Sequence, residues 1–272
     1  MTLTRAQVFQ AFKYAIYALL TLNIFLFFFE ESDAAQLQFD GGLALTQIIE
    51  AYAATIDTLA WVVLLLMFEL ETYVLDEEKV SKHLIWTLQS VRIAAYGFVL
   101  YSLYGYIANL TFFDGVEPLA DVSNLCTLAD HWTYAAGLDN FVTITSDNCT
   151  SFSAATTFYQ LPGMSTVVDA DGLAANRILA WVDVINAAVW VLIVLVLELD
   201  VRLQEHHRYS GALLKASNAS KVVLYLVLLL AAVYWGLMGD FVDFWDAFLW
   251  LVAFFFIELN VVEWHRDASA AS

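Results

Sequence analysis

Long apolar stretches alternate with shorter polar segments along the whole chain. Apolar stretches of about 20 residues are long enough to cross a membrane as helices. Their apolar residues are continuous, whereas those of a transmembrane β-strand alternate with polar ones. The pattern therefore predicts an all-α integral membrane protein with six transmembrane helices, at about residues 12–30, 57–75, 90–109, 180–200, 221–239 and 245–263.

One phrase of polar and aromatic residues recurs in three of these helices. Asp or Asn is followed four residues later by Trp, then by seven apolar residues, Glu-Leu, and finally Glu, Asp or Asn. Trp accounts for only 9 of 272 residues, so three matches in one register indicate an internal repeat. The copies are Asp57, Trp61, Glu69, Leu70 and Glu71; Asn186, Trp190, Glu198, Leu199 and Asp200; and Asp246, Trp250, Glu258, Leu259 and Asn260.

A shorter phrase precedes each copy and completes the repeat unit. A basic residue is followed four positions later by Tyr, at Lys13, Arg92 and Lys221. Each of these bases opens a further apolar run, so the repeat unit is a pair of helices. The chain is predicted to contain three two-helix hairpins, at residues 1–76, 77–202 and 203–272.

Composition and charge support a membrane location. The chain is 61% hydrophobic with a mean hydropathy of +0.68, whereas soluble domains contain about 45–50% apolar residues. The net charge is -18, but no Lys or Arg occurs in 31–56, 110–176 or 240–244. Basic residues mark cytoplasmic loops, so both termini are expected in the cytoplasm, most simply at a bacterial inner membrane. The acidity argues against nucleic-acid binding.

The longest polar segment, residues 110–176, is predicted to form a small ordered cap on the outer face. It contains aromatic residues and both cysteines of the chain, Cys126 and Cys149. Outside the cytoplasm these cysteines are expected to form a disulfide, with two free thiols as the alternative. Asn109 and Asn148 match the glycosylation pattern, which has meaning only in a eukaryotic secretory pathway; the sequence leaves open whether either is modified.

The second apolar run is predicted to begin as a helix outside the membrane, because residues 43–57 contain no Gly or Pro. No span contains Pro, and Gly is rare in the spans. Secondary transporters usually bind substrate at helices that Gly or Pro interrupts. This feature argues against that class.

Enzymatic chemistry has no recognisable motif in the chain. There is no metalloprotease motif, phosphate-binding loop or nucleophile elbow, so the protein is not expected to be an enzyme. All five His lie outside the spans or at their ends, which argues against haem. His206 and His207 could bind a metal, but a solvated basic edge is the simpler interpretation. No cofactor is predicted, apart from a bound cation.

The repeated charges allow two interpretations. A lone charge in a membrane helix costs about 2.5–3.5 kcal/mol and usually finds a partner. In the first, structural interpretation, salt bridges join Lys13 to Glu69, Arg92 to Glu198 and Lys221 to Glu258. The chain would then be a structural or accessory subunit of a larger membrane complex, in contact with lipid and with other subunits or further copies of itself.

The second interpretation, which is the predicted function with the structural role as its alternative, is a cation channel or cation-coupled transporter. Rings of carboxylates favour cations, and hard oxygen ligands suit Na⁺, Ca²⁺ or Mg²⁺. If the hairpins surround a threefold axis, the repeat would form an inner cluster and an outer ring. The inner cluster would contain Glu69, Glu198, Glu258, Glu71, Asp200 and Asn260, and the outer ring Asp57, Asn186 and Asp246.

Overall fold

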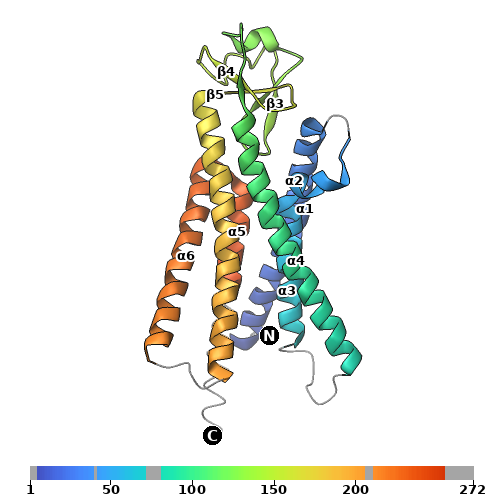
Figure 1. The fold of residues 1–272 in the computed structure, drawn as a ribbon, viewed down its shortest axis with the longest axis vertical. Coiled ribbons are helices and arrows are strands. Elements are labelled where there is room, and N and C mark those ends of the chain that lie inside the picture. The colour runs from blue at the N-terminus through green and yellow to red at the C-terminus, as the bar shows by residue number, and fades with distance from the viewer. Residues whose placement is uncertain (1–4, 40–41, 72–80, 206–210, 255–272) are drawn as a thin grey trace. The chain divides into compact units, whose positions relative to one another are not determined.

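The structure is a computed structural model that describes residues 5–39, 42–71, 81–205 and 211–254. It is mostly helical and includes a small five-stranded sheet (Figure 1). The chain divides into two compact units: a first unit of residues 1–25 and 189–272, and a second unit of residues 26–188. The long helices are α1 (Arg5–Gln38), α3 (Ala53–Glu69), α4 (Lys82–Phe112), α5 (Ala170–Glu205) and α6 (Ala212–Met238).

Four helices are long and apolar enough to cross a membrane, namely α1, α4, α5 and α6. They contain the predicted first, third, fourth and fifth spans. A bent pair, Leu45–Ala51 with Ala53–Glu69, would be a fifth if it counts as one span. The predicted sixth span is helical over residues 241–254, and its remainder lies outside the described residues. The described part of the chain therefore supports four or five spans of the six predicted.

The predicted outer extension of the second span, over residues 43–57, is not a continuous helix, so that prediction was wrong. A 3-10 turn (η1, Leu45–Gln47) and the short helix α2 (Ile48–Ala51) precede α3, and the chain bends by 80° between them. The bend occurs at Tyr52, whose φ of -136° and ψ of 39° are not helical. An early break exposes the first backbone N–H groups of α3, which then need acceptors.

Glu31 of α1 supplies those acceptors within the second unit. Its buried carboxylate accepts the backbone N–H of Ala54 at 2.7 Å and of Thr55 at 3.0 Å, and the Thr55 hydroxyl at 2.6 Å. A carboxylate at a helix N-terminus also interacts favourably with the helix dipole. The cause of the break is thus a side chain from another helix, not a Gly or Pro within the run.

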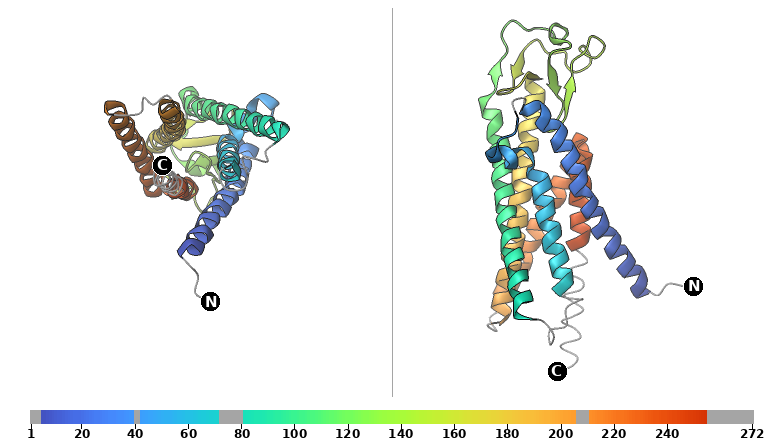
Figure 2. Two further views of the ribbon diagram at one scale, coloured as in Figure 1. Left: turned by 90° about the horizontal axis from the view of Figure 1, so that it is seen from below. Right: turned by 90° about the vertical axis from the view of Figure 1, so that its right-hand side faces the viewer.

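A glycine in α4 allows α2 to approach closely. A Cβ on Gly105 would lie 2.6 Å from the backbone oxygen of Ile49. The short α2 therefore lies directly against α4, beside the start of α3 (Figure 2). The bend at Tyr52 is stabilised on one side by Glu31 and on the other by this contact.

The cap is an ordered domain, as predicted. Its β-structure was not predicted. Its strands are β1 (Glu117–Pro118), β2 (Thr133–Ala135), β3 (Phe141–Thr143), β4 (Phe158–Gln160) and β5 (Thr166–Asp169), in the order β1-β4-β5-β2-β3. All neighbours are antiparallel except β2 and β5. Cys126 and Cys149 form the predicted disulfide. Cys149 packs in a core with Ile144, Phe158 and Val167.

Asp169 joins the sheet to the following helix. It ends β5, and its Oδ1 accepts the backbone N–H of Gly172 at 2.7 Å, which satisfies a free donor in the first turn of α5. Its Oδ2 accepts a hydrogen bond from the hydroxyl of Ser153. The cap is therefore fixed to the end of α5, as Figure 1 shows.

Tyr134 gives the cap a predictable alkaline limit. Burial, together with the nearby Asp169 carboxylate, raises the pKa of Tyr134 to about 12. The folded cap holds this proton more tightly than the unfolded chain does. The contribution of Tyr134 to stability is therefore complete below about pH 10 and is lost as the pH rises through about 12. The loss should be on the order of 2 kcal/mol.

Protease cleavage of the cap as a function of pH measures this loss. The variant Tyr134→Phe cannot ionise at this position, so its resistance to cleavage should fall less steeply above about pH 10. An identical alkaline profile for both proteins would show that Tyr134 does not set the limit.

In the first unit, the motif tryptophans lie in the interior. The Trp190 ring lies 4.6 Å from that of Phe254 and 6.3 Å from that of Trp250. Trp190 and Trp250 are both buried, and so is Trp61 in the second unit. In contrast, Trp86 and Trp181, which are not part of the motif, are exposed. The repeat phrase therefore places Trp in the packed core of each unit.

Candidate functional site: polar pairs between helices

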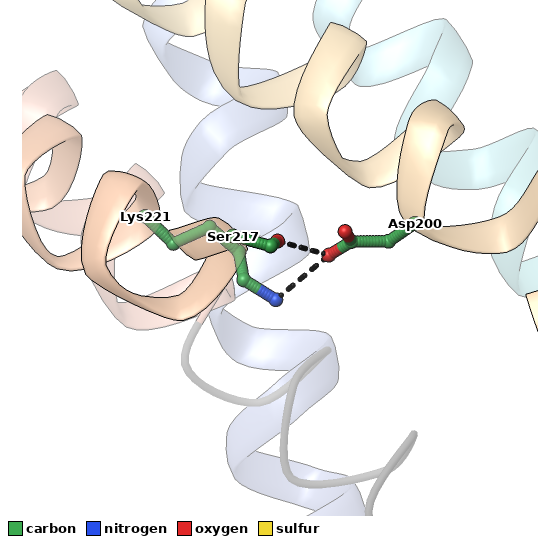
Figure 3. A network of polar contacts seen from close by, with 3 residues as sticks. All are labelled: Asp200, Ser217 and Lys221. Atoms are coloured by element: carbon green, nitrogen blue, oxygen red, sulfur yellow. Dashed lines mark hydrogen bonds and ion pairs between the residues drawn. The ribbon is translucent and has the colours of Figure 1, made fainter. Parts of the chain in front are cut away.

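A buried ion pair joins α5 to α6 in the first unit. Lys221 Nζ lies 3.1 Å from Asp200 Oδ2, and the Ser217 hydroxyl donates to the same oxygen at 2.7 Å (Figure 3). The side chains of Lys221 and Asp200 are only 18% and 7% exposed. The acid follows Glu-Leu in the second copy of the repeat, and the base opens the third hairpin.

The second unit contains the equivalent pair. Arg92 of α4 forms an ion pair with Glu71, which follows Glu-Leu in the first copy of the repeat. The separation is 21 residues in both pairs. The ion pairs therefore link the second helix of one predicted hairpin to the first helix of the next, across the basic connection.

This pairing differs from the one predicted. Arg92 was predicted to bind Glu198, but Glu198 has a 56% exposed side chain and bonds to Arg202 one turn along α5. Lys221 was predicted to bind Glu258, which lies outside the described residues, as does Asn260. The Lys13–Glu69 pair would join residues of the two units and stays a prediction.

The three repeat glutamates do not share one environment. Glu69 is buried, Glu198 is exposed, and Glu258 lies outside the described residues. Lys13 is also buried, with its Nζ 4.9 Å from the centroid of the Tyr14 ring. Over the described ranges, no group of three or more His, Cys, Asp or Glu side chains is arranged to hold a metal ion.

The outer positions of the repeat are largely buried. Asp57 is buried in α3, and Asn186 of α5 has a buried Oδ1 that finds no hydrogen-bond donor among the described residues. Asp246 accepts hydrogen bonds from the Asn23 amide, at 2.8 Å, and from the Trp250 side chain. The Trp250 bond spans one helical turn, which explains the four-residue spacing of Asp and Trp in this copy of the phrase.

Asn23 was not among the predicted site residues. This residue lies in α1, is completely buried, and connects α1 to the helix at residues 241–254 through Asp246. Its Oδ1 has no hydrogen-bond partner in the part of the chain that the structure describes. The signal that could have identified Asn23 is its position as a lone Asn in an apolar run, because polar side chains inside spans are rare and usually face the protein interior.

The side chain of Asn148, which matches the glycosylation pattern, is held by hydrogen bonds within the cap. Asn148 Nδ2 donates to the backbone oxygen of Thr143 at 2.9 Å, and its Oδ1 accepts the backbone N–H of Thr145 at 2.7 Å. A sugar on Nδ2 would disrupt this turn beside the disulfide. The geometry argues against modification of Asn148 in the folded cap.

No protein-family model, curated protein or solved structure matches this chain. Its function is therefore inferred from the residues and contacts described above.

Proposed function

We propose that the chain is a structural or accessory subunit of a membrane complex, in which the helices anchor the disulfide-closed cap outside the cytoplasm. Both termini would lie in the cytoplasm, most simply at a bacterial inner membrane. The protein partners would be other membrane subunits or further copies of the chain. This is a non-enzymatic role, and the aromatic and aliphatic side chains exposed on α4, α5 and α6 would meet lipid or partner helices.

The repeated ion pair carries this proposal. Arg92–Glu71 and Lys221–Asp200 have the same spacing and the same place in the repeat, and each joins two helices. A carboxylate that is paired with a base on the next helix is neutralised and cannot offer its full charge to a passing cation. The acids are thus used to fix the helix connections, which is the arrangement expected of a scaffold.

Two measurements test this role. Native gels of detergent-solubilised membranes should show the chain in a complex larger than its own 30.5 kDa, with a second membrane polypeptide or additional copies in fixed proportion. Proteoliposomes that contain the pure chain should show no flux along Na⁺, K⁺, Ca²⁺ or H⁺ gradients. A monomeric chain that conducts ions would contradict the proposal.

Cation transport is the second candidate function, and two observations favour it. The α2–α3 helix is broken, as in many transporters, and the half-buried carboxyl group of Asp246 accepts hydrogen bonds from two neutral side chains, Asn23 and Trp250. The variant with Glu69→Gln, Glu198→Gln and Glu258→Gln separates the candidates, once its folding and insertion are verified. Flux in the wild type that this variant loses would assign the acids to an ion path.

A further inference from the structure

The first unit contains a half-buried acid whose charge is not accounted for by its hydrogen bonds. Asp246 accepts from the Asn23 amide and the Trp250 side chain, both of which are neutral. A charge in a membrane helix is costly unless a base, a metal ion or a proton neutralises it. Lys13, the base on α1, lies ten residues from Asn23, or about 15 Å along the helix.

The same site contains an acceptor that lacks a donor. Asn23 is completely buried, and its Nδ2 donates to Asp246 while its Oδ1 has no partner within the described ranges. A buried polar atom without a hydrogen bond costs about 1–3 kcal/mol. A proton on the Asp246 carboxyl would remove both defects, because a carboxylic acid is neutral and can donate its O–H to an amide oxygen.

We infer that Asp246 and Asn23 form a proton-binding site, in which a protonated Asp246 carboxyl exchanges two hydrogen bonds with the Asn23 amide. The amide N–H donates to one carboxyl oxygen, and the carboxyl O–H donates to the amide oxygen. The proton comes from the aqueous phase and adds to the carboxylate without any other change in bonding.

The repeat supports a neutral group at this position. The equivalent residue is Asp57 in the first copy and Asn186 in the second, and Asn has the shape of a protonated Asp. A divalent cation is a poorer occupant, because such ions take about six to eight oxygen ligands, with several carboxylates among them. This inference goes beyond the structural role; it would make H⁺ the coupled cation of the second candidate function.

Infrared spectroscopy of the full chain in proteoliposomes at neutral pH tests the site. The wild-type spectrum should contain a protonated carboxyl C=O band that shifts when aspartate is labelled with ¹³C. Asp246→Asn should lose this band and stay folded. The control Asp33→Asn, at an exposed position of α1, should retain it. Asn23→Val should move the band to a higher wavenumber, because the C=O loses its amide donor.

Two results would overturn the inference. Wild type and Asp246→Asn with identical carboxyl bands would show that Asp246 is ionised. A band that appears only when choline replaces Na⁺ would assign the site to Na⁺. Neither result depends on flux, so a band without transport would support the proton site and leave the proposed accessory role intact.

Discussion

Asp200→Leu is expected to destabilise the protein by about 3–5 kcal/mol, and the additional change Lys221→Leu to recover most of that loss. The single variant leaves the Lys221 ammonium in a site where its side chain is only 18% exposed. Removal of both charges replaces the pair with apolar contact, which is often neutral or favourable. Unfolding in mixed micelles, followed by tryptophan fluorescence, measures the stability of the wild type and of both variants.

The same helix offers a matched control. Glu198 and Arg202, one helical turn apart, form an exposed ion pair, so Glu198→Leu should lower the free energy of unfolding by less than about 1 kcal/mol. Similar losses for Asp200→Leu and Glu198→Leu would mean that Asp200 is not in a buried pair. A double variant that remains as unstable as Asp200→Leu alone would show that the cost comes from packing or from Ser217, not from the uncompensated lysine.

The contrast between Glu198 and Asp200 also shows that the sequence does not determine which acid of a repeat faces the neighbouring helix. An α-helix has 3.6 residues per turn, so residues 198 and 200 project about 200° apart. Only one of them can face the neighbouring helix, and the apolar residues on both sides give no preference. The repeat singled out both charged positions, but the choice of Asp200 depends on how α5 is rotated against α6.

The long helices could be predicted because their signal is local. About 20 continuous apolar residues suffice to identify a spanning helix, and the structure has such helices at the predicted first, third, fourth and fifth positions. The Cys126–Cys149 disulfide followed from the location of its residues in one outer segment. The strands of the cap are two to four residues long, too short to produce a reliable alternating pattern.

The break at Tyr52 could not be predicted from its own neighbourhood. Residues 43–57 contain no Gly or Pro, and the sequence therefore favoured a continuous helix. The determinant is Glu31, more than twenty residues earlier, whose carboxylate binds the N-terminus of α3. A tertiary contact overrides local helix propensity here. Because a helix can thus be broken without Gly or Pro, their scarcity in the spans no longer argues against a transporter.

Glu31→Ala should therefore have a larger effect than any other acid-to-alanine change at this end of α1. The substitution removes the acceptor of three donors at once, the N–H groups of Ala54 and Thr55 and the Thr55 hydroxyl. Each buried donor without a partner costs about 1–3 kcal/mol, so a loss of at least about 3 kcal/mol is expected. Glu31→Gln keeps one acceptor oxygen and should lose less.

Hydrogen exchange locates this effect in the chain. In Glu31→Ala, the amides of Ala54 and Thr55 should exchange faster than in the wild type, while amides in the middle of α4 should change little. Asp33→Ala removes an exposed carboxylate two residues away and should leave both stability and exchange unchanged within about 0.5 kcal/mol. Equal exchange in all three proteins would mean that α3 begins at Ala53 for a reason other than Glu31, and the bend would then have to be attributed to the packing of α2 on Gly105.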